Sequence, residues 1–268
     1  MDLSNIKMIV TDMDGTLLNS NHQVSTKFFE LFKELKKQKI LFVAASGRQY
    51  NSIIDKLDSI KDDIIVVAEN GGYAVQQEKE LFSTALDNSK MHELLKIAEK
   101  IEGAHIVLCG KDNAYIKGDS DSFIQKLQQY YTEFDILDSF TNFEKEILKI
   151  AIYHSISSEH YIYPEVKHLE DSFKVKISGQ NWLDLSHENA NKGYAVEKLQ
   201  KQHQITPDET LVFGDYNNDL EMLSKATYSF AMENAHPNVL EVANYKTSSN
   251  DNYGVEKILE KLIISKNN

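Results

Sequence analysis

Apolar and polar positions along the first fifty residues follow two different periods. Short apolar runs occupy Ile6–Thr11 and Ile40–Ala45. Between these runs, apolar residues recur at the spacing of one helix face, at Phe28, Leu31, Phe32 and Leu35. This pattern predicts a strand, then an amphipathic helix, then a second strand.

Helices and strands continue to alternate beyond this unit, and the alternation returns near the end of the chain. A helix is predicted at Tyr50–Leu57 and a strand at Asp63–Ala68. Later in the chain, helices are predicted at Lys192–Gln202, Asp219–Lys225 and Gly254–Ile264. Strands are predicted between them, at Thr210–Phe213 and Tyr228–Met232. Apolar strands joined by helices are typical of a parallel sheet with right-handed crossovers. The predicted fold class is therefore α/β, with a Rossmann-like parallel-sheet core.

The pattern between residues 84 and 187 is different. Amphipathic stretches predict helices at Lys90–Ile101, Ser122–Tyr130 and Glu159–Leu169. Alternating stretches predict strands at His105–Leu108, Ala114–Lys117, Leu148–Tyr153, Phe173–Ser178 and Trp182–Leu185. The short gaps at Gly110–Asn113 and Gly179–Asn181 favour antiparallel pairing. We expect an α+β domain (84–187) inserted into a core domain formed by 1–83 and 188–268.

Composition narrows the class of protein. The 268 residues include 41 Asp and Glu against 29 Lys and Arg, a net charge of −12 that argues against a dedicated nucleic-acid binder. A single cysteine, Cys109, offers neither a disulfide nor a paired-cysteine metal site, so we expect a reducing, cytoplasmic setting. The N-terminal residues do not resemble a signal peptide, and the apolar runs are shorter than the roughly 20 residues of a membrane helix. A soluble protein without membrane association is expected.

Two carboxylates stand two residues apart directly after the first predicted strand, at Asp12 and Asp14. Open α/β sheets bind ligands at this end of their strands, where one carboxylate can attack while the other moves a proton. Gly15 permits a sharp turn, which leaves the amides of Met13 and Asp14 able to face an anion. An acidic turn without chemistry remains an alternative. An EF-hand calcium loop is excluded because Thr16 and Leu17 replace its ligand and its glycine.

A second acidic cluster, with Asp215, Asn217 and Asp219, follows a later predicted strand. A calcium loop is again excluded, because Leu220 stands at its glycine position and Ala226 at its glutamate position. Two carboxylate clusters at strand ends of one sheet would instead converge on one Mg²⁺, which prefers one or two carboxylates together with water and phosphate oxygens.

Two further segments offer partners for a phosphate group. Ser46 and Gly47 end the second predicted strand with a hydroxyl and an amide, and Lys192 places a cation at a helix start. Each signal is weak by itself, since a Ser-Gly pair usually forms a turn and a single lysine is usually solvated.

Taken in order, the four segments resemble the motifs of one enzyme family. Asp-x-Asp-Gly-Thr-Leu, Ser-Gly-Arg, Lys-Gly and Gly-Asp-x-x-Asn-Asp begin at Asp12, Ser46, Lys192 and Gly214. They resemble the motifs of the haloacid dehalogenase-like hydrolase superfamily. More narrowly, the chain is similar to Cof-type phosphatases, whose type IIB cap domain is inserted between the second and third motifs.

The resemblance implies a Mg²⁺-dependent phosphatase that hydrolyses phosphate monoesters of small metabolites, such as sugar phosphates or related compounds. It implies that Asp12 is the nucleophile that forms an aspartyl-phosphate and that Asp14 is the general acid and base. It also implies a Mg²⁺ site formed by Asp12, the Asp14 carbonyl and Asp215, with Asp219 touching the ion or supporting a ligand. The implied phosphate ligands and the candidate substrate contact are Ser46, Lys192, Asn218, the amides of Met13, Asp14 and Gly47, and Arg48.

Other activities within this resemblance are less consistent with the sequence. Dehalogenases lack the second aspartate, and phosphomutases carry a small cap after the first motif, for which Asn19–Lys27 is too short. A phosphotransferase on the same scaffold and a non-catalytic regulator that binds a phosphometabolite remain alternatives. The sequence makes no prediction of the oligomeric state.

Overall fold

The computed structural model describes residues 2–111, 113–118, 120–128 and 134–267. The chain divides into two compact units, one formed by Met1–Phe82 with Asn191–Asn268 and the other by Ser83–Ala190. Within the part of the chain that the structure describes, no helix is long and apolar enough to cross a bilayer. We call the two units the core unit and the inserted unit.

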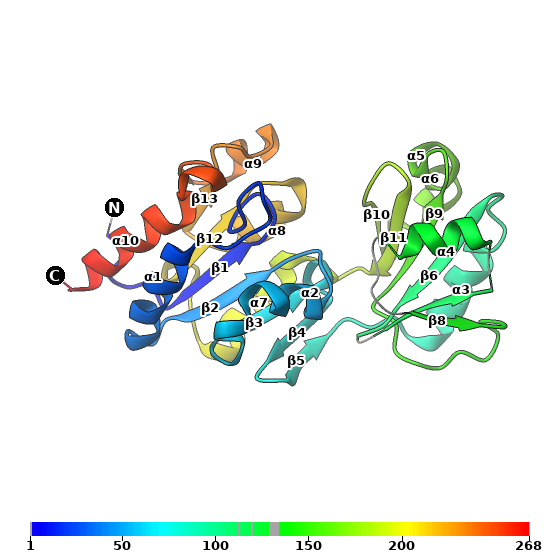
Figure 1. The fold of residues 1–268 in the computed structure, drawn as a ribbon, viewed down its shortest axis with the longest axis horizontal. Coiled ribbons are helices and arrows are strands. Elements are labelled where there is room, and N and C mark those ends of the chain that lie inside the picture. Colours follow the sequence, from blue (N-terminus) through cyan, green and yellow to red (C-terminus); the bar gives the residue numbers. More distant parts are fainter. Residues whose placement is uncertain (1, 112, 119, 129–133, 268) are drawn as a thin grey trace. The chain divides into compact units, whose positions relative to one another are not determined.

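An eight-stranded sheet forms the centre of the core unit (Figure 1), in the order β14-β13-β12-β1-β2-β3-β4-β5. Its strands are β1 (Met8–Asp12), β2 (Leu41–Ala45), β3 (Ile65–Ala68), β4 (Tyr73–Gln76), β5 (Lys79–Ser83), β12 (Thr210–Gly214), β13 (Tyr228–Ala231) and β14 (Tyr245–Lys246). The strands from β14 to β3 pair in parallel, and β4 pairs antiparallel with β3. The predicted parallel-sheet core is confirmed, with an antiparallel extension at one edge that the sequence pattern did not predict.

Helices cover both faces of this sheet. They are α1 (Thr26–Lys37), α2 (Tyr50–Leu57), α7 (Lys192–His203), α8 (Leu220–Leu223), α9 (Pro237–Val242) and α10 (Gly254–Asn267). The central strands β1, β3 and β12 are buried at every position, as expected for strands covered on both faces. In α1, Phe28, Phe32 and Leu35 are buried on one face, and the Ser25 hydroxyl accepts the Phe28 amide at the helix start.

The inserted unit contains a six-stranded sheet in the order β10-β11-β9-β6-β7-β8. These strands are β6 (Ala104–Cys109), β7 (Ala114–Lys117), β8 (Phe134–Leu137), β9 (Lys149–His154), β10 (Phe173–Ile177) and β11 (Trp182–His187). The predicted hairpins β6–β7 and β10–β11 are antiparallel, and β7 and β8 pair in parallel. Asp112, in the first hairpin turn, lies outside the described residues.

Alternate residues of this sheet belong to two separate apolar clusters. Leu108 faces the larger cluster, whereas its neighbours Val107 and Cys109 belong to the smaller one. Helix α3 (Asn88–Ala98) packs in the larger cluster and α4 (Asp121–Leu127) in the smaller. Part of the predicted helix Ser122–Tyr130, from residue 129 onward, lies outside the described residues.

The helical stretch predicted at Glu159–Leu169 is helical in the structure but is interrupted at Ile162. The structure contains two short helices, α5 (Ser158–Tyr161) and α6 (Tyr163–Val166), followed by a 3-10 turn at Lys167–Leu169. Pro164 lies in the first turn of α6. Because proline has no amide hydrogen and clashes with the preceding helical turn, it is accepted at a helix start but not inside a continuous helix.

Candidate active site

The site lies where β1, β2 and β12 end, at the carboxyl edge of the core sheet. Asp12 is the last residue of β1, and its side chain is almost completely buried. Gly15 has a φ of +78°, and a Cβ there would lie 2.2 Å from Oδ2 of Asp215. Thr16 donates its hydroxyl to Oδ1 of Asp215 at 2.9 Å. The turn after β1 therefore needs glycine both for its conformation and for the approach of the second acidic cluster.

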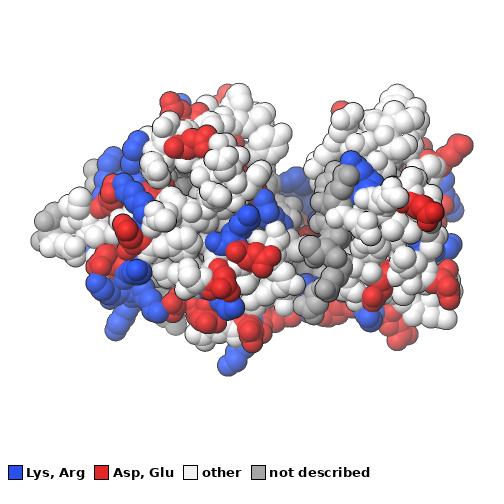
Figure 2. All heavy atoms as spheres, in the orientation of Figure 1, with Lys and Arg blue, Asp and Glu red and all other residues white. Residues whose placement is uncertain are grey.

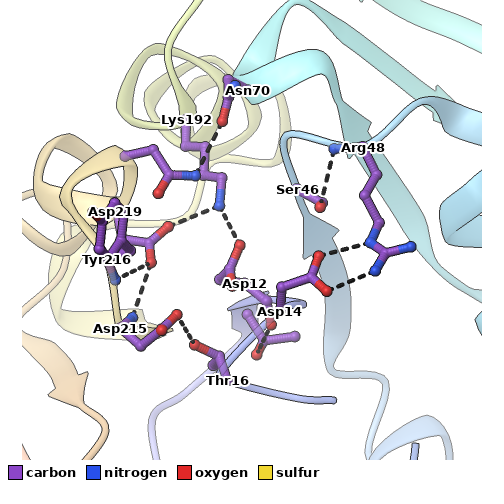
Figure 3. Close-up of polar contacts among 12 residues, drawn as sticks. Asp12, Asp14, Thr16, Ser46, Arg48, Asn70, Lys192, Asp215, Tyr216 and Asp219 are labelled. Carbon is purple, nitrogen blue, oxygen red and sulfur yellow. Dashed lines mark hydrogen bonds and ion pairs between the residues drawn. The ribbon is translucent and has the colours of Figure 1, made fainter. Parts of the chain in front are cut away.

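Lys192 connects the two acidic clusters, because its ammonium group bonds a carboxylate from each (Figure 3). It is the first residue of α7, is fully buried, and donates from Nζ to Oδ1 of Asp12 and, at 2.7 Å, to Oδ1 of Asp219. Burial by itself would lower the pKa of Lys192, but the Asp12 and Asp219 carboxylates outweigh that effect and raise it. Lys192 is therefore a permanent cation, as expected for a lysine between two buried carboxylates.

Asp219 is also fully buried, and both of its carboxylate oxygens accept hydrogen bonds. Oδ1 accepts from Lys192, while Oδ2 accepts from the amides of Asp215 at 2.9 Å and Tyr216 at 3.1 Å. Asp219 thus holds the loop that carries Asp215 in place. The sequence leaves open whether Asp219 touches a metal or supports a ligand, and here both of its oxygens already accept from N–H donors.

Three carboxylates form a group that could hold a cation. One oxygen each from Asp12, Asp215 and Asp219 lies within 4.8 Å of the others. Burial, together with the neighbouring Asp219 carboxylate, raises the pKa of Asp215 from 3.8 to about 6. Burial also raises the pKa of Asp12 well above its usual range, against the opposing effect of Lys192. One lysine does not balance three crowded carboxylates, so the donor set fits a divalent cation with a preference for oxygen ligands.

A pocket of about 340 Å³ opens over these residues. Its lining comprises Asp12, Asp14, Ser46, Gly47, Arg48, Asp215, Tyr216 and Asn218. The structure thus brings together predicted residues from three motifs that are far apart in the chain. Two predicted phosphate ligands are not in the lining: the Met13 side chain is buried in the core, and the Lys192 side chain is fully buried against Asp12.

The side chain of Asp14 pairs with Arg48. The guanidinium donates from Nε to Oδ2 at 2.6 Å and from Nη2 to Oδ1 at 2.7 Å. Nδ1 of His22 lies 3.3 Å from the same Oδ1. Partial burial would raise the pKa of Asp14, but the Arg48 and His22 contacts outweigh it and lower the pKa. Arg48, predicted as a candidate substrate contact, thus also contacts the predicted acid.

Some residues that organise the pocket were missed as site residues. Asn70 accepts on Oδ1 from Nδ2 of Asn218 at 3.0 Å, and a Cβ on Gly47 would lie 3.0 Å from the same oxygen. Asn234 donates from Nδ2 to the Gly15 carbonyl at 2.8 Å. Asn70 and Asn234 each stand two residues after a predicted strand, and that position at a strand end is the signal that could have identified them. His22 has no comparable signal.

The chain is similar over most of its length to proteins of a known family. A family model described as haloacid dehalogenase-like hydrolase matches residues 9–259, nearly the whole chain. The chain belongs to the haloacid dehalogenase-like hydrolase family. The predicted family and enzyme class are confirmed.

Relatives of this hydrolase are named as phosphatases. It is 34% identical to 5-amino-6-(5-phospho-D-ribitylamino)uracil phosphatase YbjI of Escherichia coli (strain K12), with 96% of each chain covered. It is 25% identical to phosphatase YwpJ of Bacillus subtilis (strain 168), covering 96% of this chain and 100% of the relative. This hydrolase is therefore a member of a phosphatase family.

Solved structures share the fold over almost the full length. SMU.1108c from Streptococcus mutans UA159 matches with a TM-score of 0.84 at 29% identity, covering 97% of this chain and 99% of that one. A haloacid dehalogenase subclass IIB sugar phosphatase, BT4131, matches with a TM-score of 0.77 at 20% identity, covering 95% and 98%. The predicted fold class is confirmed by these matches.

Proposed function

We propose that this hydrolase is a Mg²⁺-dependent phosphatase that cleaves phosphate monoesters of small metabolites through an aspartyl-phosphate intermediate. The observation that carries the proposal is Asp12, which lies in a pocket at a strand end and is bound by a buried lysine. A carboxylate held in this way has a fixed orientation and is shielded from bulk water, as an attacking group requires.

The chemistry follows from two neighbouring carboxylates. In the first step an Asp12 oxygen attacks phosphorus, the bond from phosphorus to the ester oxygen breaks, and Asp14 gives its proton to the departing alcohol. In the second step Asp14 takes a proton from water, the water oxygen attacks phosphorus, and the bond to Asp12 breaks to release phosphate. Asp14 lines the same pocket as Asp12, so it is in reach of the reacting groups.

Groups in and next to the pocket bind the phosphate oxygens. We assign this role to the Ser46 hydroxyl, the amides of Asp14 and Gly47, and the Asn218 side chain, which Asn70 orients. The Met13 amide, in the turn between Asp12 and Asp14, is proposed to join them although the Met13 side chain is buried in the core. Lys192 supports them with its charge through its contact with Asp12. Fixed donors and charges of this kind stabilise a transferring phosphoryl group without reorganisation.

Mg²⁺ is the cofactor that suits the carboxylate group. Asp12, Asp215 and the Asp14 carbonyl would hold the ion, with Asp219 fixing the Asp215 loop through its amide hydrogen bonds. When bound, the ion neutralises charge between an anionic nucleophile and an anionic ester.

The inserted unit is the proposed cap that determines substrate choice, and sugar phosphates or related compounds are the proposed substrates. The E. coli relative is named for 5-amino-6-(5-phospho-D-ribitylamino)uracil, an ester whose phosphate is on a sugar-like chain. We therefore propose that ester and common sugar phosphates as the first substrates to test.

The decisive experiment measures phosphate release with Mg²⁺ from p-nitrophenyl phosphate and a panel of phosphorylated metabolites. We expect turnover by the wild-type protein and a loss on the order of 10³-fold or more in Asp12→Asn, because the nucleophile is gone. Asp55→Asn, on the exposed face of α2, is the matched control and should retain wild-type turnover. An inactive wild-type protein across the whole panel would contradict the proposal and favour a binding role.

Acceptor trapping separates hydrolysis from phosphoryl transfer. If water is the natural acceptor, added alcohols should divert only a minor share of the phosphoryl group. Transfer to a specific alcohol that exceeds hydrolysis would support the phosphotransferase alternative. Mass spectrometry of acid-quenched enzyme should locate one phosphoryl group on Asp12, and its absence from Asp12 during turnover would contradict the intermediate.

A further inference from the structure

The contact between Arg48 and Asp14 is the most fully formed interaction in the pocket that the proposed mechanism does not use. Both carboxylate oxygens accept from the guanidinium, at 2.6 and 2.7 Å, in the two-pronged arrangement that makes arginine–carboxylate pairs strong. A third guanidinium nitrogen, Nη1, donates to the Ser52 hydroxyl at 3.1 Å. Arg48 is thus anchored to Ser52 of α2, and its guanidinium pairs with both carboxylate oxygens of Asp14 (Figure 3).

This arrangement opposes the acid step. To protonate a departing alcohol, Asp14 must turn one oxygen toward the ester, whereas the two-pronged pair keeps both oxygens directed at Arg48. In the structure, Arg48 donates to both oxygens, and His22 adds a further contact to Oδ1. The ion pair must therefore open before the alcohol departs.

A phosphate group is the partner suited to open it. Arg48 lines the same pocket as Asp12, Ser46 and Gly47, so its guanidinium borders the place where the phosphate must bind. Arginine binds phosphate through the same two-pronged geometry that it uses with carboxylates, and a dianionic ester offers more charge than one carboxylate.

We propose, on the basis of the phosphatase function above, that Arg48 is a positioning residue that holds Asp14 until a dianionic phosphate group takes over the guanidinium and frees the acid. Binding and activation of Asp14 are then one event. A ligand without the dianion leaves the pair closed, which makes Arg48 a determinant of specificity for phosphate monoesters.

The test is a double-mutant cycle on phosphate affinity. Inorganic phosphate is titrated calorimetrically into the Mg²⁺-loaded full chain as wild type, Asp14→Ala, Arg48→Met and the double variant. Asp14→Ala frees the guanidinium, so we expect about tenfold tighter binding, which corresponds to one strong ion pair no longer broken. Arg48→Met should bind more weakly, and the gain from Asp14→Ala should vanish in the Arg48→Met background.

A simple loss of the Asp14 negative charge would give a different result. If Asp14→Ala tightened binding only by deleting a negative charge, it would do so equally in both backgrounds, and the proposal would be wrong. The same holds if Asp14→Ala brings no gain. Ser52→Ala, which loosens the anchor of Arg48 without touching Asp14, is the control and should show a smaller change than Asp14→Ala.

Kinetics provide a second readout that a merely structural role would not change. Aryl phosphates leave without help from an acid, whereas alkyl phosphates need it. In Arg48→Met we expect KM to rise alike for p-nitrophenyl phosphate and an alkyl phosphate, with the ratio of their kcat values unchanged. A selective loss of kcat for the alkyl ester would mean that Arg48 stays on Asp14 during proton transfer, which overturns the exchange.

The two proposals fail separately. If the wild-type protein hydrolyses esters but Asp14→Ala and Arg48→Met change phosphate affinity independently, the phosphatase function stands. The proposed exchange of Arg48 from Asp14 to phosphate is then wrong. A wild-type protein without turnover contradicts the phosphatase function, while the binding cycle still reports on the Arg48–Asp14 pair.

Discussion

Lys192 is the cation that pairs with two buried carboxylates at the pocket. Its ammonium group has no solvent exposure and bonds both Asp12 and Asp219. Charges in such surroundings are tolerated only when they are paired, because the carboxylates and the lysine have all given up hydration. Removing the lysine leaves two buried carboxylates without their partner.

We therefore predict that Lys192→Met lowers the free energy of unfolding by about 3–5 kcal/mol and lowers phosphatase turnover as well. Urea unfolding followed by circular dichroism measures the first effect. Lys201→Met, on the same helix but in an exposed pair with Glu197, should change stability little. Adding Asp219→Asn to Lys192→Met should restore part of the loss. Equal unfolding midpoints for the two lysine variants would contradict this account.

Among the helices and turns, two glycines near the start of α7 determine where Lys192 lies. A Cβ on Gly193 would lie 2.7 Å from backbone atoms of Glu221 in α8, and a Cβ on Gly71 would lie 2.2 Å from the Asn191 carbonyl. Both contacts are closer than a side chain permits. The Lys192 backbone is therefore held between two elements that approach it closely because glycine has no side chain.

Gly193→Ala should force α7 away from α8. We expect a destabilisation of about 1–3 kcal/mol from overpacking, together with a lower kcat because Lys192 moves with its helix. Denaturant unfolding and steady-state kinetics measure these effects. At Gly179, in the β10–β11 turn, an added Cβ meets nothing within 4 Å, so Gly179→Ala lacks this clash and is the control. A Gly193→Ala protein as stable and active as that control would refute the packing argument.

Across the whole molecule, acidic residues outnumber basic ones, yet the surface carries both. On the face shown in Figure 2, Lys and Arg side chains lie among Asp and Glu side chains, and pairs such as Lys36–Asp63 and Lys7–Glu209 are formed. Exposed pairs of this kind add little stability. In the pocket, by contrast, burial raises the pKa of two carboxylates, Asp12 and Asp215.

Global stability should consequently depend on pH and Mg²⁺ together. The pKa of Asp215 is raised from 3.8 to about 6 in the folded protein. The stabilisation from its protonated form is therefore complete below about pH 4 and is lost as pH rises through about 6, at most about 3 kcal/mol. Without metal, the protein should melt at a lower temperature at pH 7 than at pH 5.

Mg²⁺ should reverse this trend, because it binds the ionised carboxylates and stabilises only the folded chain. Thermal unfolding with EDTA and with Mg²⁺ at both pH values measures the effect, and the rise in Tm caused by Mg²⁺ should be larger at pH 7. Asp215→Asn should weaken both dependences. If Mg²⁺ raises Tm equally at pH 5 and pH 7, the pocket carboxylates are not its ligands.

Sequence patterns predicted most of the elements that are buried on both faces. The runs around β1, β2 and β12 are continuous and apolar, so their type and order were readable without the fold. The β4–β5 hairpin and β8 were missed because these strands are short and carry exposed or half-buried residues. Their existence depends on a neighbouring strand edge rather than on a strong local signal.

The sequence by itself determined the family, the α/β core and the residue types of the pocket, because hydrophobic period and motif spacing are local properties of the chain. The tertiary structure alone decided which partner each charged group takes. Lys192 bonds Asp12 and Asp219, and Arg48 pairs with Asp14. Such pairings join residues far apart in the chain, and they arise only when the folded sheet brings its strand ends together and removes water from between the charges.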